Sequence, residues 1–140
     1  MTCNYIKSVA AAALLSFGLS LQASGQCQQY AEVCSPILKP YTSDGQFHRA
    51  LLQEGETAEF AATFYKGNTY RVVACTGPDS DTLRFKVLDS NYQEIFSSDD
   101  YDYPRYWDFR FNATDRYYIQ GELMEGVASG CGVILIGFKE

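Results

Sequence analysis

The chain has 140 residues, of which 46% are hydrophobic and 20% charged, and this suits one globular domain with a sizeable core. Eleven basic against seventeen acidic side chains give a formal net charge of -6, which disfavours nucleic-acid and anionic-membrane partners. The abundance of tyrosine and phenylalanine, with 11 and 9 residues, favours half-buried strands over helices.

The N-terminal segment has the features of a secretory signal. Lys7 is the only charged side chain before Glu32, and residues 8–21 form an apolar run of fourteen residues. The run is shorter than the roughly 20 residues that span a bilayer, and it has the length of a signal-peptide core. We therefore expect export and no membrane span in the mature chain.

Small residues mark the expected cleavage site. Ala23 and Gly25 predict cleavage before Gln26, and cleavage directly after Ala23 is the alternative. Residues 1–25 are thus expected to be a signal peptide of a periplasmic or extracellular protein. The mature chain would keep ten basic and seventeen acidic side chains, a formal charge of -7.

Four cysteines remain after residue 25, and an even number in an oxidising compartment predicts two disulfides. None of their spacings resembles the paired CxxC of a zinc site. The four residues are Cys27, Cys34, Cys75 and Cys131.

Residues 26–45 form a lead-in segment in which a short helix could run from Gln28 to Cys34, ahead of Pro36. In a regular helix Cys27 and Cys34 would share a face but lie ~10.5 Å apart, whereas a disulfide needs Cα atoms within roughly 7 Å. Either this segment turns tightly and closes a local Cys27–Cys34 loop, which we favour, or one of the two cysteines reaches into the body of the domain.

From residue 46 onward, stretches of alternating hydrophobicity are separated by turn signals every eight to twelve residues, as in all-β sandwiches. Residues 46–140 therefore predict one β-sandwich domain. Residues 131–138 are a nearly continuous apolar run, typical of a central strand covered on both faces. The eight predicted strands span 47–53, 58–65, 69–76, 82–88, 92–96, 106–111, 116–121 and 131–138.

The predicted fold class is all-β, an eight-stranded antiparallel sandwich of the jelly-roll kind. In that topology the last strand lies antiparallel beside the third. The end of the third strand at Cys75 would then face the start of the eighth at Cys131. We therefore predict a Cys75–Cys131 disulfide, which in the chain-entropy description stabilises the fold by ~4 kcal/mol.

A series of short motifs resembles the bacterial pre-peptidase C-terminal domain, an eight-stranded jelly-roll sandwich of secreted proteins. The motifs are Glu59-Phe60, GNTYRV at 67–72, DTLRFKV at 81–87, DRYYI at 115–119 and CGVI at 131–134. The resemblance implies an exported bacterial module that assists secretion, stability or substrate contact. Some members of this family bind calcium or polymeric substrates.

Signatures of catalysis are missing from the sequence. His48 is the only histidine, which excludes paired-histidine zinc motifs, and neither a GxSxG elbow nor a Gly-Lys-Ser/Thr phosphate loop occurs. We interpret His48 as a surface residue at the start of a strand. We therefore expect that the protein is not an enzyme.

The most unusual stretch is SSDDYDYPRYWD, residues 97–108, which joins two predicted strands. Clustered carboxylates suit Ca²⁺, which takes six to eight oxygen ligands, although the residue order of an EF-hand is absent. A solvated acidic turn is the competing interpretation. The candidate calcium ligands are Asp99, Asp100 and Asp102, with Asp79 and Asp81 from another loop.

The aromatic residues of the same stretch also suit a platform for sugar rings, because flat apolar faces lie beside carboxylate acceptors. The candidate ligand-binding residues are Tyr101, Tyr103, Tyr106 and Trp107. The two-residue spacing from Trp107 to Phe109 and Phe111 favours an indole that points into the core. In that case the tyrosines remain for the surface.

The sequence thus favours a non-catalytic exported β-sandwich that acts by binding or structural association. Its partner would be an unknown protein or a glycan. The alternative is calcium-assisted binding of a carbohydrate or polymer through residues 97–108.

Overall fold

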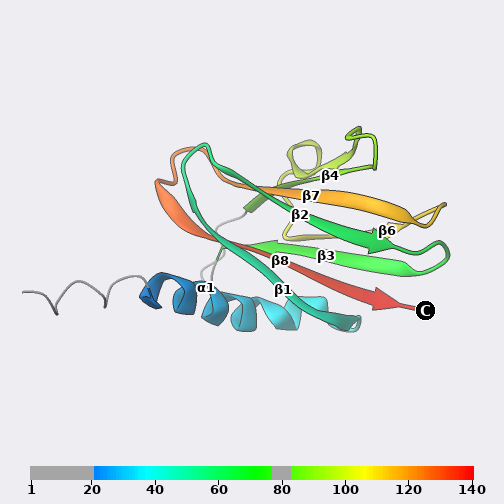
Figure 1. Cartoon of the computed structure of the whole chain (residues 1–140), viewed down its shortest axis with the longest axis horizontal. Helices are drawn as coiled ribbons and strands as arrows, with labels where there is room; N and C mark the ends of the chain where they lie inside the picture. The colour runs from blue at the N-terminus through cyan, green and yellow to red at the C-terminus, as the bar shows by residue number, and fades with distance from the viewer. Residues whose placement is uncertain (1–20, 77–82) are drawn as a thin grey trace, which may run out of the picture.

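The computed structural model of the chain describes residues 21–76 and 83–140, which form a helix and two layers of strands (Figure 1). The helical elements are α1 (Leu21–Cys34) and the 3-10 helices η1 (Ser35–Leu38) and η2 (Ser98–Tyr101). The strands are β1 (Thr42–Gln53), β2 (Thr57–Phe64), β3 (Thr69–Cys75), β4 (Leu83–Leu88), β5 (Glu94–Ser97), β6 (Tyr106–Arg110), β7 (Asp115–Leu123) and β8 (Ser129–Lys139).

The strands form two antiparallel sheets of four strands each, in the orders β1-β8-β3-β6 and β2-β7-β4-β5. These orders are the connectivity of a jelly roll, so the predicted fold class is confirmed. The predicted neighbourhood of the third and eighth strands is also confirmed, because β8 lies antiparallel beside β3.

All eight predicted strands are present, and the largest shift is at the start of β1. We predicted a start at residue 47, whereas Thr42 already pairs with Phe138. A register shift lies between Ser43 and Phe47, with Gly45 at a φ of 81°. Because such a bulge breaks the alternation of side chains, the first part of β1 has no period-two pattern in the sequence.

The core lies between the two sheets and is built from alternate residues of each strand. Among its most buried side chains are Phe64, Phe85, Val72, Ile119 and Ile134. Burial of each phenyl ring stabilises the fold by about 1.5–3 kcal/mol. This packing fixes the ends of the strands from which the loops start.

Helix α1 lies on the outer face of the β1-β8-β3-β6 sheet (Figure 1). Ala31 and Leu38 pack there against Val73, Val133 and Leu135, which are all buried. Strand β8 is therefore covered on both faces, as its apolar run predicts. No helix among the described residues is long and apolar enough to cross a membrane.

The predicted helix of the lead-in segment is present, but it is longer than residues 28–34. It begins at Leu21 and so runs through the expected cleavage site before Gln26. Cleavage at that site stays a prediction. A helix starting at Gln26 would still contain both cysteines of the lead-in segment.

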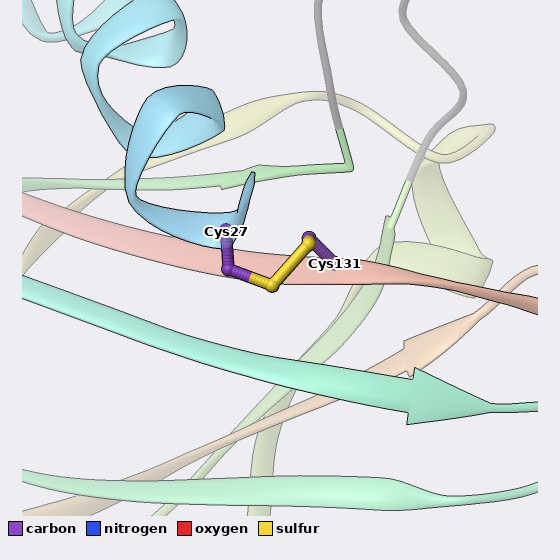
Figure 2. The surroundings of a disulfide bond; sticks show 2 residues. All are labelled: Cys27 and Cys131. Carbon is purple, nitrogen blue, oxygen red and sulfur yellow. A yellow bond between two sulfur atoms is a disulfide. The ribbon is translucent and has the colours of Figure 1, made fainter. Parts of the chain in front are cut away.

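Two disulfides join α1 to the sheet beneath it. Cys27 is bonded to Cys131 on β8, with the Cα atoms 5.3 Å apart, and Figure 2 shows this bond between the helix and the strand. Cys34 is bonded to Cys75 on β3, with the Cα atoms 6.5 Å apart. All four side chains are buried.

The predicted pairings Cys27–Cys34 and Cys75–Cys131 are therefore wrong. Cys75 lies opposite Val133 in the ladder, two residues beyond Cys131. The two sheet cysteines face outward, where α1 covers them. Two helical turns separate Cys27 from Cys34, so each of them meets a different strand of the sheet.

Candidate functional site

The candidate site is the loop of residues 98–105, which joins β5 to β6. These are edge strands of the two sheets, so the loop passes from one layer to the other. Its first turn is η2, where the Ser97 side chain accepts a hydrogen bond from the Asp99 N–H at 3.3 Å. Serine suits this N-cap position, because its hydroxyl satisfies an N–H that the helix leaves unpaired.

Hydrogen bonds to buried groups hold the rest of the loop in place. The fully buried Ser98 hydroxyl accepts from the Phe85 N–H of β4 at 3.0 Å, and the Ser98 carbonyl accepts from the Tyr103 N–H at 3.0 Å. At the far end the Ala74 N–H of β3 donates to the Arg105 carbonyl at 2.8 Å. The loop is thus anchored on both sheets.

Two consecutive residues of the loop have left-handed backbone. The φ angle is 57° at Asp102 and 53° at Tyr103. Aspartate tolerates this region, whereas for a tyrosine it costs roughly 1–2 kcal/mol. The surrounding hydrogen bonds maintain this conformation, which reverses the chain between η2 and β6.

Two arginines hold two of the carboxylates of this stretch. Arg84 of β4 donates from Nε to Asp99 Oδ1 at 3.0 Å and from Nη2 to Asp99 Oδ2 at 2.5 Å. Arg71 of β3 donates in the same two-point manner to Asp108, at 2.8 and 3.0 Å. The hydrogen bonds from Arg84 lower the pKa of Asp99, so this carboxylate stays ionised in the folded protein.

The aromatic residues form a stack that starts in the core and ends at the surface. The ring of Tyr101 lies parallel to that of Phe96, with centroids 5.5 Å apart, and 4.4 Å from the ring of Trp107. Trp107 and Phe109 are partly buried against the core, so the predicted inward orientation of the indole is confirmed. Tyr101 itself is 53% exposed.

Tyr106 lies on the opposite face of β6 from Trp107, because neighbouring residues of a strand alternate. Its ring stands 4.1 Å from the Arg71 guanidinium, and 42% of the residue is exposed. Tyr103 is half-buried. The four predicted ligand-binding residues are therefore neighbours, but they do not share one flat platform.

An open depression of about 480 Å³ lies at strand β6, beside the loop. Pro104, Tyr106, Trp107 and Asp108 line it. The depression thus combines aromatic surface with a carboxylate that Arg71 already binds.

The predicted calcium ligands do not gather in the described part of the chain. Asp99 forms an ion pair with Arg84, whereas Asp100 and Asp102 are exposed. Asp79 and Asp81 lie in 77–82, outside the described residues. Within 21–76 and 83–140 no group of three or more His, Cys, Asp or Glu could hold a metal ion. Calcium binding stays a prediction.

Arg71 and Arg84 are the residues of the site that sequence reasoning missed. Their positions in alternating strands indicate that they face outward, away from the buried Leu83 and Phe85 in the case of Arg84. The identity of their partners depends on the strand order, which brings β3 beside β6 and η2 beside β4. The strand order depends on the whole fold, so it cannot be inferred from the residues around each arginine.

His48 is half-buried, which corrects its interpretation as a surface residue. It pairs with Ile134 in the ladder, and its ring lies 5.1 Å from that of Phe60 in the other sheet. Its Nε2 is buried with no hydrogen-bond partner within the described residues. Burial lowers the pKa of His48, and the Asp44 carboxylate offsets part of that effect.

Comparison with solved structures supports the description of the fold. No family model matches the sequence, and neither does any curated protein. Among solved structures, the chain is similar to PliG of Aeromonas hydrophila, a periplasmic inhibitor of g-type lysozyme. That likeness has a TM-score of 0.55 and 16% identity, over 72% of this chain and 90% of that one.

The chain is also similar to PliG of Salmonella Typhimurium, a periplasmic inhibitor of the same enzyme class. Here the TM-score is 0.48 and the identity 12%, over 72% of this chain and 91% of that one. At 16% identity, the similarity to the Aeromonas hydrophila protein shows a shared fold. The class of protein is a disulfide-linked, eight-stranded β-sandwich.

Proposed function

We propose that the protein is an exported, non-catalytic module that binds a protein partner through the loop 98–105. The observation that carries this proposal is the loop itself, because it presents the exposed ring of Tyr101 from a backbone anchored on both sheets. Ordered aromatic side chains at the surface are typical anchors of protein interfaces, since little entropy is lost when they bind.

Three features support an inhibitor-like role outside the cytoplasm. The two disulfides suit an oxidising compartment. The expected mature charge of -7 favours association with a basic protein. The fold is similar to that of a periplasmic inhibitor of g-type lysozyme, so a g-type lysozyme is the first partner to test.

A glycan is the second candidate partner. The depression at β6 favours it, because Tyr106 and Trp107 supply aromatic surface beside the Asp108 carboxylate. The depression is open and Arg71 holds Asp108, so few polar groups remain to orient a sugar. The resemblance to the pre-peptidase C-terminal domain is compatible with either partner and stays a prediction.

Calorimetric titration with a g-type lysozyme tests the proposal. We expect Tyr101→Ala to weaken binding at least tenfold, as loss of an interface anchor does. Tyr65→Ala is the matched control, because Tyr65 is 57% exposed and its ring contacts no other aromatic ring within the described residues. No binding by the parent protein, or equal affinities of the two variants, would contradict the proposal.

A further inference from the structure

We propose that the partner presents a basic side chain, an arginine or a lysine, to the ring of Tyr101 and to the carboxylates of Asp100 and Asp102. This inference rests on the proposed function and specifies the chemistry of the partner's surface. It is carried by the charges that the protein leaves unpaired and by the way in which it already holds one of its own arginines.

Asp100 and Asp102 are the carboxylates of the loop that the protein does not neutralise itself. Asp99 and Asp108 are each held by an arginine. No ion pair within the described residues involves Asp100 or Asp102, and both are exposed. A partner can therefore pair with them without breaking an existing ion pair.

The charge balance of the surface favours a cation. The stretch 98–108 and the two arginines that contact it contain four carboxylates and three guanidinium groups, of which Arg105 is exposed within the loop. The mature chain as a whole carries an expected charge of -7. Both the local and the long-range field thus attract a basic surface.

The exposed part of Tyr101 is suited to a cation. Phe96 lies parallel to the ring with centroids 5.5 Å apart and Trp107 stands at 4.4 Å, yet 53% of Tyr101 is exposed to solvent. A cation within about 6 Å of an aromatic centroid is attracted by the ring's electrons. Neighbouring carboxylates strengthen this attraction.

On the other face of β6 the protein already binds a guanidinium in this manner. Arg71 lies 4.5 Å from the ring centroid of Tyr41 and 4.1 Å from that of Tyr106, while Asp108 pairs with its two edge nitrogens. Tyr101, which lies between Asp100 and Asp102 in the sequence, supplies the same two kinds of group, an aromatic ring and carboxylates, and all three residues are exposed. Within the described residues, however, no cation lies over the ring of Tyr101 and no ion pair involves Asp100 or Asp102.

Fluorescence titration of the oxidised protein with a tryptophan-free tetra-arginine peptide tests the inference. Trp107 is the only tryptophan of the chain, and it lies against Tyr101, so its emission reports on this site. We expect a saturable change that salt weakens. Tyr101→Phe should keep the affinity, and Tyr101→Leu should reduce it roughly threefold.

The charge control is a matched pair of double variants. Asp100→Asn with Asp102→Asn removes two charges from the loop and should weaken peptide binding roughly fivefold. Glu54→Gln with Glu125→Gln removes two charges from the β1–β2 and β7–β8 turns and should change it little. A tetra-glutamine peptide should give no saturable signal.

Equal effects of the two double variants, or no saturable response to the arginine peptide, would overturn the inference. A saturable response to a chitin oligosaccharide alone would also overturn it. If the inference fails while a g-type lysozyme binds in a Tyr101-dependent way, the proposed function stands. If the peptide binds as expected and lysozyme does not, the basic-side-chain inference stands and that partner is excluded.

Discussion

Arg71 and Asp108 form a two-point ion pair across neighbouring strands, with Nε–Oδ1 at 2.8 Å and Nη2–Oδ2 at 3.0 Å. The remaining nitrogen, Nη1, donates to the carbonyls of Ile37 and Lys39, which follow α1. One guanidinium therefore connects β3, β6 and the end of the N-terminal segment. Only arginine has donors in this planar arrangement.

Arg71→Lys should destabilise the protein by about 1–2 kcal/mol in urea unfolding, because an ammonium cannot bind Asp108 at two points and reach both carbonyls. Arg110→Lys is the control, since Arg110 is exposed on β6 and forms no ion pair with the described residues. Equal midpoints for the two variants would show that the Arg71 contacts contribute nothing measurable.

The disulfides provide a second prediction. Peptide mapping of the oxidised protein should recover Cys27 linked to Cys131 and Cys34 linked to Cys75. Replacing Cys27 and Cys131 by serine should lower the free energy of unfolding by about 4 kcal/mol, as expected for a long closed loop. Both bonds attach α1 rather than joining the two sheets, so the circular-dichroism signal of the strands should persist.

Recovery of a Cys27–Cys34 peptide would contradict this description of the N-terminal segment. It would mean that α1 is held on the sheet by packing alone.

The half-buried His48 gives a prediction about pH. Burial lowers its pKa below the ordinary value of 6.5, so the neutral imidazole is favoured in the folded state. Its contribution to stability is therefore complete above that ordinary value and is lost as the pH falls below it. Burial raises the pKa of Asp44 in the folded state. Its contribution to stability is therefore present at low pH and is lost as the pH rises through that pKa.

We expect the parent protein to lose more stability than His48→Phe between about pH 7.5 and about pH 5.5. Phenylalanine keeps the ring beside Phe60 and cannot be protonated. Urea unfolding at the two pH values measures the difference. Parallel losses in the two proteins would show that His48 does not titrate differently on unfolding.

Thermal melting with millimolar Ca²⁺ or with EDTA distinguishes the two interpretations of the acidic stretch. Because Arg84 occupies both oxygens of Asp99, we expect the two curves to coincide. A calcium site with a Kd a hundredfold below the added concentration would instead stabilise the fold by about 2.7 kcal/mol. A shift that Asp100→Asn abolishes would support the calcium site.

Much of the fold could be predicted from side-chain alternation. The strand at 82–88 is an example, since Leu83, Phe85 and Val87 are buried while Lys86 is exposed. The continuous apolar run of β8 also predicted a strand covered on both faces. These patterns are local, because each residue's environment follows from the face of the strand on which it lies.

The disulfide pairing and the ion pairs could not be predicted in this way. Cys75 and Cys131 do lie on adjacent strands, but α1 covers that face and supplies the partner of each. The sequence of α1 does not indicate against which face of which sheet the helix packs. In the same way, the partner of Arg84 follows from the path of the loop over β4.

Hydrogen–deuterium exchange of the oxidised protein, with and without a g-type lysozyme, tests the central claim most directly. A bound partner slows amide exchange where it covers the backbone or suppresses local opening. We predict that protection on binding is concentrated in residues 98–106. Protection confined to other loops, or no change at saturating lysozyme, would contradict the claim that this loop binds such a partner.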